Sequence, residues 1–497
     1  MVGFAFPALS ALFLTPWVIR GLGTSRYGLF LLCMTTIGFM SMLELGLASA
    51  AVHELSRARV QGESKHASIV YSTVVCLFVV LATIGAAIVF FGADFAVTAI
   101  FNISIEEQAE AIVCVKMAAI GLFCNLAVAP SVSAIRSAER FDVQSKVGVA
   151  VTTFATLGTF WRGSQGDLIG ALAFNLAGSV TTLALLSTLA RRLDPARTRL
   201  VSPTRAVLSE LWRFASFQML SRVAAAIGQE IGKLVLASTL GTRELAWFST
   251  PFSMLQRVQR LLGTASGIMF PRIARLSGAG ERDAVVRTYR QAQKALIPVA
   301  MAMTLPLGAA AKPFLSAWID PEFAEQAWQP MIIAAIAFAI SGAGVGFVQT
   351  LLGLGRSRAV FKVEVAHVLI NTSLLLPFTG MFGVTGAALS FLCGWLSLAI
   401  GQMAIERELG SAASRGIATI LFATTALALP VCFAVHWLAL SLVDIGVLGP
   451  LCVCGLGTLT ILTGLAWIPG VFGEDVEVAA ELRGAPRRLL SRIRQSR

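Results

Sequence analysis

The sequence predicts an all-α integral membrane protein with about 14 transmembrane helices, arranged as two pseudo-symmetric six-helix bundles plus two extra helices. Composition predicts the class, because hydrophobic residues make up 56% of the 497 residues, charged residues make up 13%, and the mean hydropathy is +0.78. Soluble proteins carry about 25% charged residues. So few charges exclude a conventional soluble enzyme, a disordered protein and a secreted disulfide scaffold.

Continuous apolar runs of about 20 residues predict the individual spans. Their continuity, in place of short alternating strands, indicates helices. The predicted spans cover residues 2–19, 27–51, 69–92, 109–132, 147–160, 168–190, 214–239, 247–270, 295–311, 330–353, 361–379, 383–404, 416–441 and 448–470.

The loops predict the orientation of these spans. Of the 39 Lys and Arg residues, 29 fall in alternate loops on one side, five fall in loops on the other side, and five fall within spans. Positively charged loops stay in the cytoplasm, so both termini are expected there. The net charge of +12 therefore reflects topology and does not predict a nucleic-acid partner. The basic tail, residues 471–497, is expected to lie along the anionic inner surface of the membrane.

An internal repeat predicts the arrangement of the spans. One constant offset in residue number aligns Leu22-Gly23-Thr24 with Leu240-Gly241-Thr242, and Gly62-Glu63 with Gly280-Glu281. The same offset places Arg140 on Arg358, and one residue of slippage brings Gly166 onto Gly383. Two halves with an even number of spans share one orientation, as in transporters built from parallel repeats.

The repeat predicts five parts of the chain. They are an N-terminal six-helix bundle (1–190), a basic cytoplasmic linker (191–213), a C-terminal six-helix bundle (214–404), two appended helices (416–470) and a basic cytoplasmic tail (471–497).

Several short motifs resemble the polysaccharide flippase family. They are Arg20-Gly-Leu-Gly-Thr-Ser-Arg-Tyr-Gly28, Leu43-Glu-Leu-Gly-Leu47, His53-Glu-Leu-Ser-Arg57, Pro271-Arg-Ile-Ala-Arg-Leu276, Leu352-Gly-Leu-Gly-Arg356 and Gly383-Val-Thr-Gly-Ala-Ala388. The resemblance implies membership of the superfamily of multidrug, oligosaccharidyl-lipid and polysaccharide exporters. It further implies a protein of the bacterial inner membrane that moves polyprenyl-diphosphate-linked oligosaccharide to the periplasmic leaflet. Membrane lipids and the polymerase and glycosyltransferases of the same pathway are the other partners it implies.

Charged side chains within the predicted spans are the candidate substrate site, since charge at bilayer depth costs at least about 2.5–3.5 kcal/mol and marks functional positions. One face of span 214–239 carries Gln218, Arg222, Gln229 and Lys233, and one face of span 247–270 carries Ser253, Arg257, Arg260 and Thr264. Lys116 is a further cation, and the acids counted at depth are Glu44, Glu230 and Glu364.

This excess of cations favours an anionic substrate, because the planar guanidinium can donate two parallel hydrogen bonds to phosphate oxygens. Arg257, Arg222, Arg260 and Lys233 are therefore expected to line a cavity and hold a diphosphate, with Gln218, Gln229 and Lys116 as further polar residues there. The alternative is structural: Glu230 and Lys233, three residues apart, can neutralise one another, and Arg222 and Arg260 can reach an interface.

Glu364, His367 and Asn371 share one face of span 361–379. With Glu230 they are candidates for ion coupling, because a Glu–His pair at membrane depth can relay protons. The alternative is an interhelical hydrogen-bond cluster.

Other functions are weighed against transport of this cargo. The eight cysteines lie in apolar runs without metal or redox spacing, so no disulfide, metal or cofactor is expected. The longest outer loop, residues 312–329, is too short for a sugar-binding domain, which disfavours a membrane glycosyltransferase or polymerase. A cation-coupled drug or metabolite exporter of the same superfamily stays open as the alternative transporter.

Overall fold

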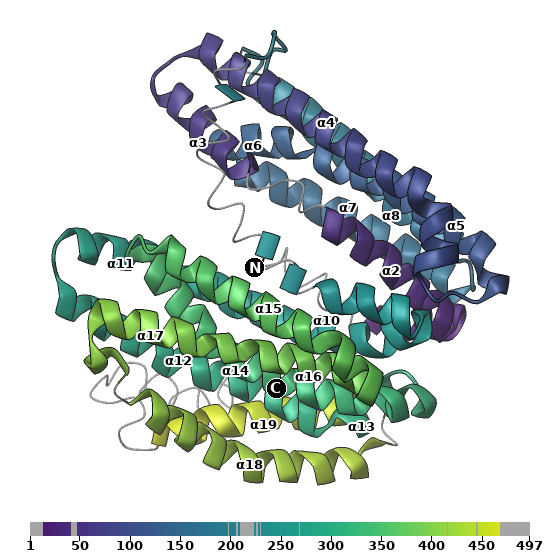
Figure 1. The fold of residues 1–497 in the computed structure, drawn as a ribbon, viewed down its shortest axis with the longest axis vertical. Helices are drawn as coiled ribbons and strands as arrows, with labels where there is room; N and C mark the ends of the chain where they lie inside the picture. The colour runs from purple at the N-terminus through teal and green to yellow at the C-terminus, as the bar shows by residue number, and fades with distance from the viewer. Residues whose placement is uncertain are drawn as a thin grey trace, which may run out of the picture. The chain divides into compact units, whose positions relative to one another are not determined.

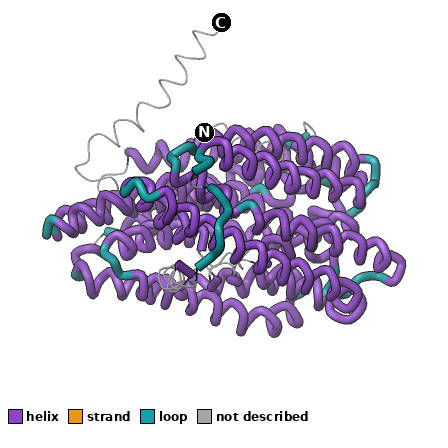
Figure 2. Tube along the Cα trace, turned by 90° about the horizontal axis from the view of Figure 1, so that it is seen from above, coloured by secondary structure: helices purple, strands orange, loops and turns teal. Residues whose placement is uncertain are grey.

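The protein's structure is a computed structural model that describes residues 13–40, 47–196, 198–204, 207–208, 223–224, 227–228, 230–267, 269–414, 416–443 and 446–467. Within these residues every regular element is a helix and none is a strand (Figure 2). The predicted all-α class is confirmed.

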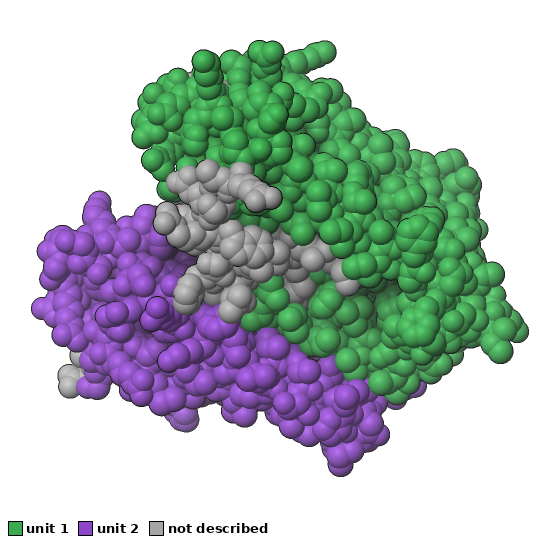
Figure 3. All heavy atoms as spheres, turned by 45° about the horizontal axis from the view of Figure 1, so that its top comes forward, with its two compact units in different colours: residues 1–246 green, residues 247–497 purple. Residues whose placement is uncertain are grey.

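The chain packs into two compact units, residues 1–246 and residues 247–497, coloured separately in Figure 3. The six-span halves expected from the repeat would divide the chain earlier, in the linker 191–213, and they stay a prediction.

The first unit is built from long helices joined by short turns (Figure 1). They are α2 (Thr24–Met40), α3 (Leu47–Val60), α4 (Ser64–Phe95) with the π-helical turn η2 (Ala96–Ile100), α5 (Ile105–Ala127), α6 (Ala129–Ser137), α7 (Phe141–Ser164) and α8 (Leu168–Leu193).

The second unit begins within α10 (Thr242–Ser266). It continues with α11 (Met269–Gly278), α12 (Arg282–Ala309), α13 (Ala311–Trp318), α14 (Pro321–Gly353), α15 (Ser357–Phe382), α16 (Val384–Gly394), the 3-10 turn η3 (Trp395–Ser397), α17 (Leu398–Leu409), η4 (Ser411–Ser414), α18 (Ile417–Ser441) and α19 (Leu448–Trp467). The span predicted for 295–311 is broken near its end, where α12 and α13 meet at 68°. The span predicted for 383–404 contains the 3-10 turn η3 and runs on from Val384 to Leu409.

Eight stretches of helix in the described part of the chain are long and apolar enough to cross a membrane, or nine if α12 and α13 form one span. The surface supports this interpretation, since large apolar side chains such as Phe91, Phe95, Phe422 and Trp437 are exposed. Such exposure would be costly in water and is what lipid contact requires.

The turns of the internal repeat have the same backbone geometry in both halves. Gly62 and Gly280 both adopt the left-handed conformation, at φ values of 72° and 75°. Five backbone hydrogen bonds around Gly62 recur around Gly280, at the offset that aligns these two glycines. They are Gln61→Arg57, Gly62→Arg59, Glu63→Ala58, Ser64→Gly62 and Ala67→Glu63 in the first half, and Ala279→Arg275, Gly280→Ser277, Glu281→Leu276, Arg282→Gly280 and Val285→Glu281 in the second. The repeated sequence around Gly62 and Gly280 therefore forms the same turn in both halves.

A second pair of matching turns precedes α7 in the first half and α15 in the second. The difference in residue number between these two turns is smaller by two than at Gly62 and Gly280. Arg140 donates its amide to the carbonyl of Ile135, and Arg356 donates to Leu351 in the same way. The preceding residues, Glu139 and Gly355, both have positive φ, 58° and 73°. Arg140 thus corresponds to Arg356, and the alignment of Arg140 with Arg358 is wrong by two positions. The chain between the two turns is shorter by that amount in the second half, which a single matched arginine could not reveal.

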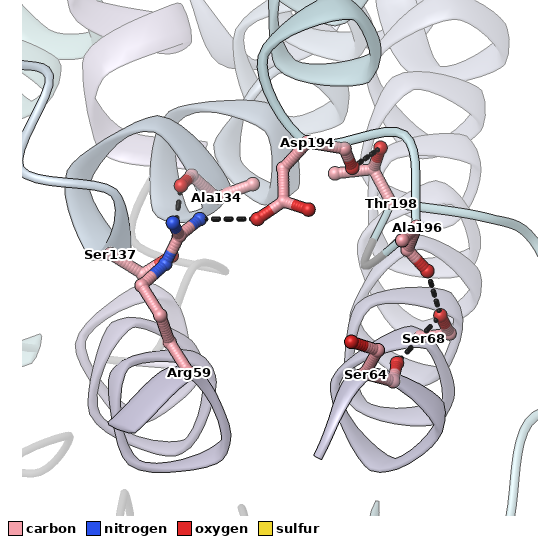
Figure 4. Close-up of polar contacts among 8 residues, drawn as sticks. All are labelled: Arg59, Ser64, Ser68, Ala134, Ser137, Asp194, Ala196 and Thr198. Atoms are coloured by element: carbon pink, nitrogen blue, oxygen red, sulfur yellow. Dashed lines mark hydrogen bonds and ion pairs between the residues drawn. The ribbon is translucent and has the colours of Figure 1, made fainter. Parts of the chain in front are cut away.

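The first part of the predicted linker is bound to the end of α3 and the start of α4 (Figure 4). The Arg59 guanidinium contacts the Asp194 carboxylate at 2.5 Å, and the Ser68 hydroxyl donates to the Ala196 carbonyl at 2.7 Å. Ser72 continues this line, because its hydroxyl accepts a hydrogen bond from the amide of Val201 at 2.8 Å. The chain after α8 is therefore held along the first turns of α4.

Candidate functional site

One side of α10 carries the polar stripe predicted for the substrate site. The opposite side is a buried aromatic face, with the Phe252 ring 4.9 Å from Phe248, 5.1 Å from Phe338 and 4.8 Å from Phe391. This packing sets the rotation of the helix about its axis. At 100° per residue, Arg257 lies about 140° from Phe252 around the helix, whereas Arg260 lies about 80° from it. Arg257 is therefore on the side opposite the aromatic face, and Arg260 is on its flank.

The two arginines of α10 differ in their surroundings. Arg260 is exposed, and its guanidinium donates to the Gln256 side-chain oxygen at 2.7 Å. Because an amide is a neutral acceptor, this bond orients the guanidinium without cancelling its charge. Arg257 is half-buried and also engaged in an interaction. The stripe thus presents guanidinium groups on a helix that the aromatic face holds in place.

Lys233 is placed in an ion pair. Its ammonium lies 2.8 Å from the Glu230 carboxylate, and the Lys233 side chain is buried. This is the pairing of residues three apart that the sequence left open as the structural alternative. Gln218, Arg222 and Gln229, the other members of that predicted stripe, lie outside the described residues, as does Glu44.

Lys116 on α5 is paired with a residue that the sequence reasoning did not count as an acid at depth. Its ammonium lies 2.9 Å from the Asp94 carboxylate and 5.8 Å from the centre of the Phe90 ring. Asp94 was missed because the span was predicted to end at residue 92, whereas α4 continues to Phe95. The signal available in sequence was the unbroken apolar pattern on both sides of Asp94.

The ion-coupling candidates of α15 lie partly in an aromatic pocket. His367 is buried, with its ring 4.6 Å from Trp395 and 5.4 Å from Phe391. Gly394 permits this approach, since a Cβ there would lie 2.8 Å from the histidine ring. Asn371 is buried one turn further on, and Glu364 is half-buried one turn before.

Two buried polar atoms in this pocket have no hydrogen-bond partner within the described part of the chain: Nδ1 of His367 and the indole nitrogen of Trp395. Unsatisfied groups are costly in a hydrocarbon surrounding. These two nitrogens are therefore polar groups that a hydrogen-bonding partner would stabilise. Across the described residues, no group of three or more His, Cys, Asp or Glu side chains has metal-binding geometry.

Solved transporter structures share this fold. An inward-facing multidrug resistance MATE family transporter of the MOP superfamily matches with a TM-score of 0.67 at 13% identity, over 82% of this chain and 96% of that one. The lipid II flippase MurJ, in an inward closed conformation, also matches with a TM-score of 0.67, at 12% identity over 93% of this chain and 98% of that one. The fold of this chain is therefore that of the MOP-superfamily membrane transporters.

The family follows from the sequence comparisons. The model of the polysaccharide biosynthesis protein family matches residues 8–277, more than half of the chain, so the chain belongs to that family. A putative O-antigen transporter of Shigella flexneri is 18% identical over 393 residues, which are 79% of this chain and 92% of that protein. The resemblance seen in the short motifs is confirmed.

Proposed function

We propose that this transporter flips polyprenyl-diphosphate-linked oligosaccharide from the cytoplasmic to the periplasmic leaflet of the bacterial inner membrane, for surface polysaccharide biosynthesis. The observation that carries the proposal is the polar stripe of α10, where Arg257 lies opposite a buried aromatic face and Arg260 is exposed beside it. Family membership supports a polysaccharide precursor as the cargo.

The stripe suits a lipid-linked diphosphate for a chemical reason. The diphosphate is the part of this cargo that resists entry into hydrocarbon, and charge-assisted hydrogen bonds from guanidinium groups replace the water it loses. The headgroup would enter from the cytoplasmic leaflet, while the prenyl tail stays in lipid. Arg222 and Lys233, with Gln218, Gln229 and Lys116, would complete the polar lining.

Alternating access would then carry the headgroup across. The two six-helix bundles would rock between inward-open and outward-open states, with the bound cargo shifting the populations of the two states. Glu364, His367, Asn371 and Glu230 would couple this change to an ion, with His367 accepting or releasing a proton in its aromatic pocket. Both termini would be cytoplasmic, and polymerase and glycosyltransferases of the pathway would act next to the transporter.

The test is flipping of a labelled polyprenyl-diphosphate oligosaccharide by the purified full chain in vesicles. Arg257→Ala is expected to lower the initial rate about tenfold or more, since a hydrogen bond to a charged group contributes about 1.5–3 kcal/mol. Arg257→Lys keeps the charge but loses the planar fork, and is expected to fall between wild type and Arg257→Ala. The control Arg140→Ala removes an exposed arginine outside the stripe and should leave the rate unchanged.

Two results would count against the proposal. Wild-type rates in Arg257→Ala would remove the stripe from the transport path. Export of cationic dyes without any movement of the lipid-linked sugar would favour the drug exporter, which shares this fold.

A further inference from the structure

A basic pocket of about 590 Å³ lies within the second unit, between the start of α15 and the end of α17. These two ends meet because α15 and the stretch α16–η3–α17 run antiparallel from their junction at Gly383, which places Ser357 and Leu409 together at the other end. The distribution of Lys and Arg among the loops predicts that this end faces the cytoplasm.

The pocket carries an excess of positive charge. Arg356, Arg358, Lys362 and Arg407 line it, against the single carboxylate of Glu408. That carboxylate accepts a hydrogen bond from Nε of Arg356 at 2.8 Å, so four basic groups and one acid leave an excess of three positive charges. The N-terminus of α15, with no side-chain cap, adds the positive end of the helix dipole.

The floor of the pocket is apolar and continues toward the membrane interior. Ile400 and Met403 line it between the cations. On α15, Leu369 and Leu376 follow Arg358 and Lys362 on the same helical face, and both are exposed. On the other wall of the pocket, formed by η3 and α17, the exposed Leu396 and Met403 lie on the same helical face as Arg407.

We propose that this pocket binds the headgroup of an anionic phospholipid of the cytoplasmic leaflet, with its acyl chains along the exposed leucines of α15 and η3–α17. The pocket and the lipid are complementary along the length of the lipid. The phosphate would contact the cations, and the acyl chains would contact the exposed apolar side chains of the two helices. Basic pockets between transmembrane helices on the cytoplasmic side are suited to such headgroups. The inference does not depend on what the chain transports.

The equivalent corner of the first half has different chemistry. At the offset that aligns Arg140 with Arg356, Asp142 occupies the position of Arg358 and Lys146 matches Lys362. The Arg140 guanidinium donates to the Asp142 carboxylate at 2.9 and 3.2 Å, so the carboxylate neutralises the charge of Arg140. The first half therefore offers a matched control site on the same protein.

The experiment is native mass spectrometry of the purified full chain in a neutral detergent, with phosphatidylglycerol and phosphatidylcholine in competition. Wild type is expected to prefer phosphatidylglycerol, and the double variant Arg358→Asp/Lys362→Gln is expected to bind it about tenfold more weakly or worse. The control Arg140→Asp/Lys146→Gln makes the same change of charge in the first half and should keep wild-type affinity. Arg407→Gln, on the other helix, gives a second test with a several-fold loss expected.

Three results would overturn the inference. They are equal binding of the two lipids by wild type, an unchanged preference in both second-half variants, and displacement of phosphatidylglycerol by inorganic phosphate alone. The last would assign the pocket to a free anion, because phosphate cannot use the exposed apolar side chains.

Discussion

The two halves of the repeat share their turns but differ in their charges. At the offset that aligns Gly62 with Gly280, Arg257 of α10 corresponds to Phe39 of α2. At the smaller offset of the later turn, Arg358 of α15 corresponds to Asp142 of α7. The backbone hydrogen bonds of the turns are the same in both halves, while the side chains on the matching helices differ. The comparison teaches that these turns recur in both halves, whereas the cations of the α10 stripe and of the basic pocket belong to the second half.

The largest effect on stability is expected where the first half has Gly28 and the second has Ala246 at the matching position. A Cβ on Gly28 would lie 1.7 Å from the carbonyl oxygen of Thr242, so Gly28→Ala must push the start of α2 away from the start of α10. Overpacking of this kind costs about 1–3 kcal/mol, and a clash with backbone belongs to the upper end of that range. We expect a clearly lower Tm of the purified protein.

Gly38→Ala is the matched control for Gly28→Ala. Gly38 lies on the same helix, and a Cβ there meets nothing within 4 Å. Alanine is the better helix former, so this variant should be neutral or slightly more stable. Equal Tm changes in both variants would contradict the close approach of the two helix starts.

An intermediate effect is expected at the turns before α7 and α15, where Glu139 and Gly355 share a positive φ. Gly355→Ala is expected to cost about 1 kcal/mol, because a Cβ disfavours the left-handed conformation and no contact compensates. Glu139→Gly, in the other half, should not lower the free energy of unfolding. Chemical unfolding monitored by helical circular dichroism measures both. A larger loss in Glu139→Gly than in Gly355→Ala would mean that the two turns are not equivalent.

The smallest effect is expected at Asp142. Its hydrogen bond from Arg140 lowers the pKa of the Asp142 carboxyl, so any stabilisation is present above the carboxyl's usual pKa of about 3.9 and is lost as the pH falls through the lowered value. Both side chains are exposed, and exposed pairs contribute little. Asp142→Asn should therefore leave the Tm at pH 7 unchanged. A large drop in Tm would show that Arg140 and Asp142 are buried by another part of the molecule.

The helices and turns of this protein could be predicted from local properties of the sequence. Apolar runs located the eight or nine stretches that could cross a membrane in the described part of the chain. Gly62 and Gly280 located the repeated turns, because hydropathy and the left-handed conformation act at single positions. The ends of helices were less predictable. The span predicted to end at residue 92 continues to Phe95, and this continuation brought Asp94 to Lys116.

The candidate sites could be predicted only in part. The polar stripe of α10 follows from helical spacing, and Arg257 lies opposite the aromatic face of that helix, while the role of the stripe in binding stays a prediction. Arg356, Arg358, Lys362 and Arg407 were read from the sequence as loop charges that orient the protein. Their convergence on one pocket could not be inferred, since it depends on two helix ends that lie about 50 residues apart in the chain.

By itself, the sequence determined the helical class, the repeated turns and the family, because apolar runs, glycine positions and short motifs are each readable along a single segment. Only the tertiary structure decided that Lys233 pairs with Glu230, that Lys116 pairs with Asp94, and that the corner of the second half is a basic pocket. The physical reason is that the effect of a charge within the membrane depends on its nearest neighbours in space, and most of those neighbours come from other helices.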